Sequence, residues 1–179
     1  MMQQSLAPLE INHPTTTEHA MESVRTSREI ASVQGAVFMA KKFPRNEDLA
    51  IKRILKSCER VGLASQAIYQ YAKGGSKIEG PSIRLAETLA QSWGNMDSGI
   101  RELEQNNGSS LVESYAWDLE TNTRNSKIFT VSHVRHTRER DYTVTDPREI
   151  YELVANNGAR RLRACILGVI PGDIVDLAV

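Results

Sequence analysis

Positive charge gathers in two stretches of the chain, and the chemistry that such stretches perform is phosphate binding. Residues 156–170 carry three arginines and no acid: Arg160, Arg161 and Arg163. None has an acidic residue three or four positions away, so ion pairs within one helix do not account for them. Residues 124–140 carry five cations against one acid: Arg124, Lys127, Arg135, Arg138 and Arg140. Such a row of cations predicts nucleic-acid binding without base readout, whereas the alternative is a solvated helix face beside a basic loop.

A glycine-rich segment over residues 73–80 adds two more cations, Lys73 and Lys77. It lacks the order of glycines, lysine and hydroxyl residue that wraps a triphosphate, so it is not a nucleotide-hydrolase loop. Two interpretations stay open: a tight hairpin turn, or a basic loop tip that touches phosphates. Four aromatic residues of predicted strands could stack on bases or fill a core: Tyr69, Tyr71, Tyr115 and Trp117.

Residues for catalysis or metal binding do not form a usable pattern. His133 and His136 are three apart in a predicted strand, so they point to opposite faces and are poorly placed to share a metal. Asp118 and Glu120 are expected to face solvent, and no serine, histidine and acid order suggests a nucleophile. We therefore expect a protein that is not an enzyme and has no metal, cofactor or catalytic residue.

Overall composition limits the class of protein but not its partner. Twenty-two Lys and Arg balance 22 Asp and Glu over 179 residues, so only local charge is informative. Two cysteines, Cys58 and Cys165, lie far apart and predict reduced, packed thiols. The N-terminus has no signal-peptide pattern and the apolar runs are too short to span a membrane, which predicts a cytoplasmic protein.

Periodicity and turn signals predict the elements that position these residues. Helices are expected over 21–43, from 47 to a stop at Gly62, over 81–93 with Pro81 in first position, and over 147–170 with a weak point at 156–158. Asn46 and Asp146 are the expected N-caps. A small hairpin is expected over 67–79, and three strands over 100–105, 111–119 and 127–134, the first two joined at Asn107-Gly108.

These elements predict the α+β class, with a three-stranded antiparallel meander covered by helices on one face. Residues 1–20 are polar and rich in Pro and Thr, which predicts a disordered tail. A single domain is expected over residues 21–179, with its core at about 64–175. An N-terminal helical segment and the small hairpin come before the helix and meander of that domain.

Part of this order resembles a known family. Ile78-Glu79-Gly80, a helix that ends at Trp93-Gly94, three antiparallel strands and a helix that contains Gly158 to Arg163 resemble the annealing core of the eukaryotic Rad-type recombination mediator. The resemblance extends to phage single-strand annealing proteins of the Red-beta, RecT and Erf kinds. The resemblance covers about residues 78–174 and implies a β-β-β-α fold.

The resemblance also implies a function and a site. In that family a Gly-x-basic-basic-x-x-basic run lines a groove that holds single-stranded DNA by its backbone. Its first two basic positions fall on Arg160 and Arg161, and its third on Ala164, next to Arg163. A further family cation at the start of the first core helix falls on Ser82, two residues before Arg84. With the basic residues named above, the DNA-binding candidates are Arg160, Arg161, Arg163, Lys127, Arg135, Arg84, Lys73, Lys77 and Arg124.

The expected activity is therefore ATP-independent annealing of complementary DNA strands during phage recombination and repair, in the cytoplasm of a bacterial host. The resemblance implies a homo-oligomeric ring or helical filament, and a phage exonuclease or a host single-strand-binding protein as a further partner. An alternative is a non-enzymatic interaction module, such as a phage inhibitor of a host nuclease. That alternative predicts no length-dependent affinity for single-stranded DNA.

Overall fold

The computed structural model describes residues 16–137 and 140–179, without the side chains of residues 16–19 and Lys73. The chain divides into two compact units, residues 1–39 and 40–179, where the sequence predicts one domain over 21–179. Helix α1 (Thr16–Lys42) forms the described part of the first unit and ends in the second. It begins five residues before the predicted start at 21, and residues 1–15 of the predicted tail lie outside the described residues.

The second unit contains five further helices and seven strands among its described residues. Its helices are α2 (Glu47–Cys58), α3 (Val61–Ala64), α4 (Ile83–Trp93), α5 (Pro147–Leu167) and α6 (Gly172–Leu177). Its strands are β1 (Ile68–Lys73), β2 (Ser76–Pro81), β3 (Met96–Asn106), β4 (Ser109–Asp118), β5 (Thr123–Ser132), β6 (Val134–His136) and β7 (Asp141–Thr143). The predicted class, α+β with a three-stranded antiparallel meander flanked by helices and preceded by a small hairpin, is confirmed.

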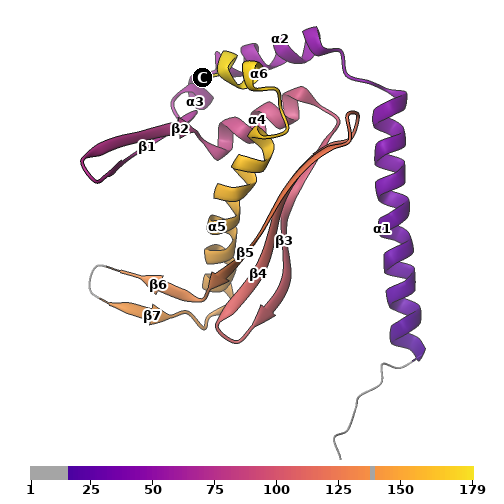
Figure 1. The fold of residues 1–179 in the computed structure, drawn as a ribbon, viewed down its shortest axis with the longest axis vertical. Helices are drawn as coiled ribbons and strands as arrows, with labels where there is room; N and C mark the ends of the chain where they lie inside the picture. The colour runs from indigo at the N-terminus through magenta and orange to yellow at the C-terminus, as the bar shows by residue number, and fades with distance from the viewer. Residues whose placement is uncertain (1–15, 138–139) are drawn as a thin grey trace, which may run out of the picture. The chain divides into compact units, whose positions relative to one another are not determined.

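The central sheet has the order β3-β4-β5, and α5 packs across all three strands (Figure 1). Side chains alternate along β4, so Val112, Ser114 and Ala116 face the helices and are fully buried. Leu85 and Leu89 of α4 and Ile166 of α5 are equally buried in the same core. The apolar stripe of each helix therefore covers one face of the sheet, as the sequence predicts.

Helix α5 runs without a break through residues 156–158, so the predicted weak point there is wrong. A Cβ on Gly158 would lie 2.7 Å from the Cδ1 of Ile100, which means that glycine lets β3 approach the helix closely. The carbonyl of Gly158 also accepts a hydrogen bond from the Oγ of Ser114 at 3.0 Å, and Asn157 donates its side chain to the Leu153 carbonyl at 2.9 Å. Tertiary contacts thus outweigh the low helix propensity of this segment.

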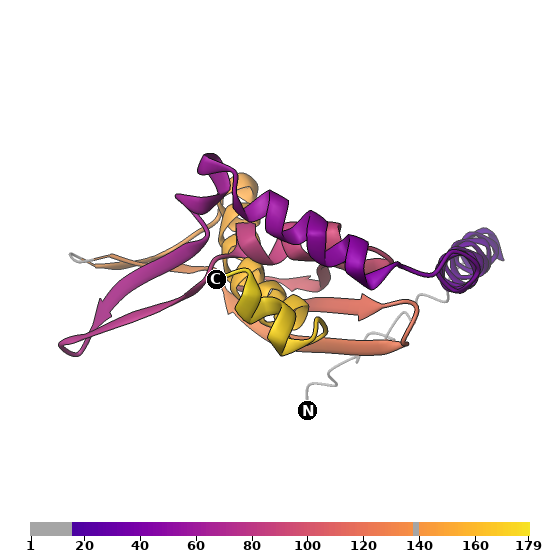
Figure 2. The same cartoon turned by 90° about the horizontal axis from the view of Figure 1, so that it is seen from above.

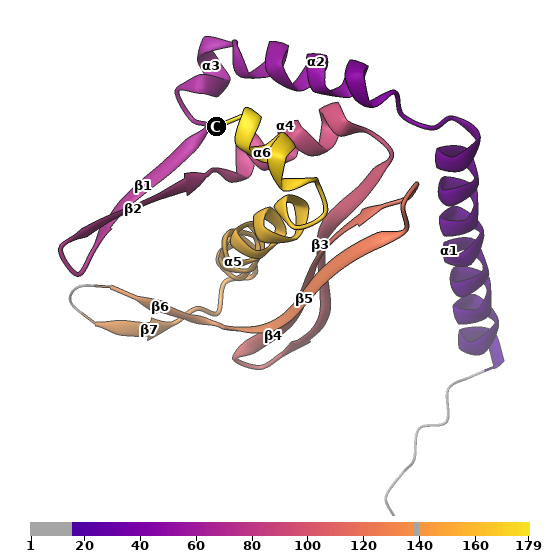
Figure 3. The same cartoon turned by 45° about the horizontal axis from the view of Figure 1, so that its top comes forward.

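Two hairpins extend from the same side of α5. Hairpin β1–β2 lies at one end of the helix and β6–β7 at the other, as Figures 1 and 3 show from two directions. The first was predicted, whereas the second was missed because its strands have only three residues each. Seen from above in Figure 2, both hairpins again extend in one direction from the helical layer. This side of α5 is therefore flanked by two projecting hairpins.

Helix ends follow local hydrogen bonds, which confirm some predicted caps and correct others. Asn46 and Asp146 accept from backbone N–H groups of the first turns of α2 and α5, as predicted. The predicted stop at Gly62 is wrong, since α2 ends at Cys58 and Gly62 lies in α3. Pro81 closes β2 and does not begin a helix, because Ser82 accepts from the backbone N–H of Leu85 and caps α4.

Candidate functional site

A pocket of about 410 Å³ lies between hairpin β1–β2 and helix α5. Tyr69 and Tyr71 line it from the hairpin, and Arg160 and Arg163 line it from the helix. This tyrosine–arginine pocket joins segments about 90 positions apart in the sequence. Two of the predicted DNA-binding arginines therefore meet two of the predicted stacking aromatics.

The two tyrosines are neighbours because side chains on a strand alternate between its faces. Their ring centroids lie 6.0 Å apart, and the ring planes differ by 21°. Gly80 pairs with Tyr69 across the hairpin, and a Cβ there would lie 3.0 Å from the Tyr69 hydroxyl. Glycine at position 80 thus leaves room for the Tyr69 ring to lie over β2.

Arg160 and Arg163 are one helical turn apart, so their side chains leave the same face of α5. The guanidinium of Arg163 lies 4.2 Å from the centroid of the Tyr69 ring, while Arg160 is exposed. Neither arginine has an ion pair with a carboxylate among the residues that the structure describes. Their positive charge is therefore available to an anion that enters the pocket.

Arg161 does not line this pocket. Its guanidinium stacks 4.1 Å from the ring centroid of Phe129 on β5, and it donates to the Asn157 carbonyl at 3.0 Å. Lys127 pairs with Ser114 in the register of β4 and β5, so its side chain leaves the sheet on the face that α5 covers. Lys127 is exposed, and its charge acts on the thiol of Cys165 in α5.

Other predicted cations lie on separate parts of the second unit. Arg84 is on α4 and lines a different pocket with residues of α3, and Lys77 is on β2, 4.0 Å from Glu79. Arg135 is half-buried on β6 opposite Tyr142. The side chain of Lys73 and the whole of Arg138 lie outside the described residues. The candidates whose side chains the structure describes therefore do not form one continuous row.

Arg124 lies on the face of the sheet opposite to the one that α5 covers, so it does not share a surface with the α5 arginines. It pairs with Trp117 in the strand register and forms an ion pair with Glu113 at 3.0 Å. Tyr115 lies on that same face under Arg101, whose guanidinium is 4.4 Å from the ring centroid. Tyr115 and Trp117 are thus remote from the tyrosine–arginine pocket, because odd-numbered positions of β4 point away from α5.

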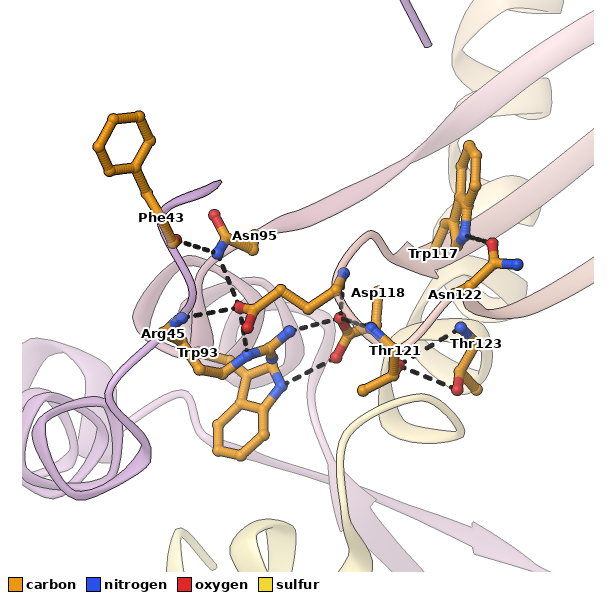
Figure 4. Close-up of polar contacts among 10 residues, drawn as sticks. Phe43, Arg45, Trp93, Asn95, Trp117, Asp118, Thr121, Asn122 and Thr123 are labelled. Carbon is orange, nitrogen blue, oxygen red and sulfur yellow. Dashed lines mark hydrogen bonds and ion pairs between the residues drawn. The ribbon is translucent and has the colours of Figure 1, made fainter. Parts of the chain in front are cut away.

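A second cluster of arginine and aromatic residues is buried where the chain enters α2 (Figure 4). Arg45 forms ion pairs with Asp118 and, at 2.8 Å, with Glu120, and its guanidinium lies 4.7 Å from the centroid of the Trp93 ring. Asn95 donates to Glu120 at 2.7 Å and to the Phe43 carbonyl at 2.9 Å. The side chain of Arg45 is only 5% exposed, so this Arg45 cluster is part of the core.

The carboxylates of the Arg45 cluster correct the expectation that Asp118 and Glu120 face solvent. Asp118 is 2% exposed, and it also accepts from the backbone N–H groups of Glu120 and Thr121. Burial by itself would raise the pKa of Glu120. Hydrogen bonds from Asn95 and Arg45, with the charge of Arg45, outweigh it and hold the pKa of Glu120 below its ordinary value of 4.5. Both groups are therefore structural carboxylates.

The two histidines of the predicted strand have separate structural roles. His133 lies between β5 and β6, is buried, and has its Nε2 2.7 Å from the Oγ of Ser110. Ser110 is fully buried, and His133 is 2% exposed at the wall of a separate pocket of about 300 Å³. His136 lies on β6, with its Nδ1 2.9 Å from Asp141. Among the described residues, no three His, Cys, Asp or Glu side chains gather as metal ligands.

Both cysteines are free thiols. Burial raises the pKa of each, and for Cys165 the nearby Lys127 opposes this effect without reversing it. Cys165 also donates its S–H to the Ser114 carbonyl at 3.4 Å. Neither group is therefore an activated nucleophile.

Comparisons with protein-family models, curated proteins and solved structures find no match for this chain. Over the described part of the chain, no helix combines the length and the apolar character that crossing a bilayer requires.

The sequence did not predict two features, the tyrosines of the pocket and the ion pairs of Arg45. Tyr69 and Tyr71 were considered for stacking but were not among the DNA-binding candidates, although their alternate positions on one strand indicate a shared face. Arg45 was missed because it is an isolated arginine after a proline, and nothing local shows that it reaches Asp118, 73 positions away.

Proposed function

We propose that this protein binds single-stranded DNA and anneals complementary strands without ATP, metal or other cofactor, and that it is not an enzyme. The observation that carries the proposal is the tyrosine–arginine pocket, where Arg160 and Arg163 face a ligand-sized space without carboxylate partners among the described residues. Arginine in such a place binds phosphate. The adjacent tyrosines favour nucleic acid over a free anion.

Annealing in this proposal is a physical process, in which the protein holds one strand extended until its complement pairs. Arg160 contacts a phosphate at the pocket, where Arg163 adds its positive charge at the wall, and Arg161 and Lys127 add positive charge toward the sheet. A homo-oligomer, either ring or filament, multiplies the affinity of each subunit. The protein would act in phage recombination in a bacterial cytoplasm, beside a phage exonuclease or a host single-strand-binding protein, as the resemblance to annealing proteins suggests.

Fluorescence anisotropy of a labelled oligo-dT strand, measured at several salt concentrations before a complementary strand is added, tests the proposal. We expect binding that weakens steeply with salt, followed by faster duplex formation without ATP. The double variant Arg160→Ala and Arg161→Ala should lose annealing while remaining folded, because Arg160 is an exposed charge and Arg161 gives up one ring contact and one hydrogen bond at the surface of α5. Arg53→Ala, which removes an exposed helical arginine of α2 that is not among the DNA-binding candidates, is the control and should anneal normally.

Two results would contradict this function. A folded sample that does not bind oligo-dT at low salt would favour the non-enzymatic protein-interaction module instead. Normal annealing by the double variant would show that Arg160 and Arg161 do not hold the strand.

A further inference from the structure

We propose that the tyrosine–arginine pocket holds one nucleobase per subunit, stacked on the ring of Tyr71, with the adjoining phosphate at Arg160. This inference rests on the proposed function and adds a base contact to a backbone contact. It makes Tyr71 a binding residue and Arg163 a positioning residue. It also predicts that the bound strand turns one of its bases toward the protein.

The exposure of the two tyrosines distinguishes their roles. Tyr69 is half-buried, with the Arg163 guanidinium over its ring and Gly80 beneath it. Tyr71 is 50% exposed, and its recorded ring contact within the described chain is with Tyr69. A large aromatic side chain that is half exposed at the wall of a pocket can cover a flat ligand, because each base has a π-face.

Arg163 contributes through Tyr69. A guanidinium 4.2 Å from a ring centroid is within the range of a cation–π contact, so it fixes the ring against the helix. The Tyr69 ring is in turn nearly parallel to that of Tyr71. Arg163 of α5 therefore orients Tyr69, and Tyr69 in turn lies against Tyr71.

Charge and polarity in the pocket favour a nucleotide over other flat ligands. Arg160 is exposed at the same wall and has no carboxylate ion pair within the described residues, so it takes a phosphate attached to the stacked base. A base inside a duplex is already paired and stacked on both sides. The pocket therefore prefers single strands, and a stacked base must leave Tyr71 before it can pair with a complement.

Abasic DNA separates base stacking from phosphate contact. The probes are a labelled dT strand and a strand of equal length and charge in which every base is absent. For the wild type we expect the abasic strand to bind about tenfold more weakly, since stacking one base on an aromatic residue is worth about that factor. Tyr71→Leu should bind both strands with the same reduced affinity and an unchanged salt slope.

Two further variants complete the design. Tyr71→Phe keeps the ring and should restore the preference for dT, which shows that the leucine variant lost stacking and not its fold. Arg160→Gln should weaken both strands alike and reduce the salt slope by about 0.7, the value for one phosphate contact on a single strand. Arg163→Gln should lower the preference for dT, because its effect passes through Tyr69.

The outcomes distinguish this inference from the proposed function. If the wild type binds dT and abasic strands equally, or if Tyr71→Leu keeps the preference for dT, the stacking inference is wrong while DNA binding stands. If the wild type binds neither strand, the proposed function fails, and the stacking inference fails with it.

Discussion

Arg45 and Arg163 both lie over an aromatic ring, at 4.7 Å and 4.2 Å from the centroids, yet their electrostatic surroundings are opposite. Arg45 is buried and faces two carboxylates. Arg163 has no carboxylate ion pair among the residues that the structure describes, and it lines an open pocket. The comparison teaches that an arginine on an aromatic ring does not by itself indicate a binding site. The balance of charge around it separates a structural role from a binding role.

The largest expected difference concerns stability. Arg45→Ala leaves Asp118 and Glu120 without their cation, and breaking a buried ion pair from one side costs about 3–5 kcal/mol. Arg160→Ala removes an exposed charge and should change the free energy of unfolding by less than about 0.5 kcal/mol. Urea denaturation of both variants measures the two effects. Equal losses of unfolding free energy in the two variants would contradict the distinction between the Arg45 cluster and the tyrosine–arginine pocket.

A smaller effect is expected where α5 meets the sheet. Gly158→Ala places a Cβ 2.7 Å from the Cδ1 of Ile100, and overpacking of this kind costs about 1–3 kcal/mol. Adding Ile100→Val removes that methyl group and should recover part of the loss, which a double-mutant cycle detects. Strictly additive losses would show that the two side chains do not meet. DNA affinity of the single variant then reports whether the pocket depends on this contact.

The pH dependence of the Arg45 cluster sharpens the same contrast. The folded-state pKa of Glu120 lies below its ordinary value of 4.5, so its stabilisation is present above that value and is lost as the pH falls through the lowered pKa. The difference in the free energy of unfolding between the wild type and Glu120→Gln should therefore become smaller as the pH is lowered from 6 toward 3. Denaturation curves across this range check the sign, and a difference that widens in acid would contradict it.

The smallest expected effect is on the pocket itself. Arg163→Lys keeps the positive charge but loses the planar stack on Tyr69, a contact worth about 0.5–1 kcal/mol at an exposed site. Affinity for oligo-dT should fall by roughly two- to fivefold, with an unchanged salt slope. Anisotropy titrations at two salt concentrations measure both quantities. Arg45→Lys is the stability counterpart, and it should unfold at a lower urea concentration because one ammonium does not replace the contacts of the guanidinium with both carboxylates.

The sequence predicted those parts of the fold that depend on neighbouring residues. The meander, the first hairpin, and the caps at Asn46 and Asp146 follow from alternation, turn residues and local hydrogen bonds. Long-range contacts were not predictable in this way. The position of Gly158 inside α5 goes with the close approach of Ile100, and the buried Asp118 pairs with Arg45.

The candidate site shows the same division. The basic run at Arg160 and Arg163 was visible in the sequence, but its meeting with Tyr69 and Tyr71 required the three-dimensional path of the hairpin. The face on which Arg124 lies was also not predictable from the sequence. Side chains alternate along a strand, so the face of Arg124 follows only from its pairing with Trp117 of β4.

The close contact at Gly158 also sets how accurately α5 can present its cations. If the helix tilts about that contact, a residue moves in proportion to its distance along the axis. Arg163 is five residues away, about 7.5 Å at 1.5 Å per residue, so a tilt of about 10° displaces its backbone by only about 1.3 Å. The first turn, at Pro147, lies about 16 Å from the same pivot and moves more than twice as far. For a tilt about this contact, the backbones of Arg160 and Arg163 therefore move less than the first turn of α5 does.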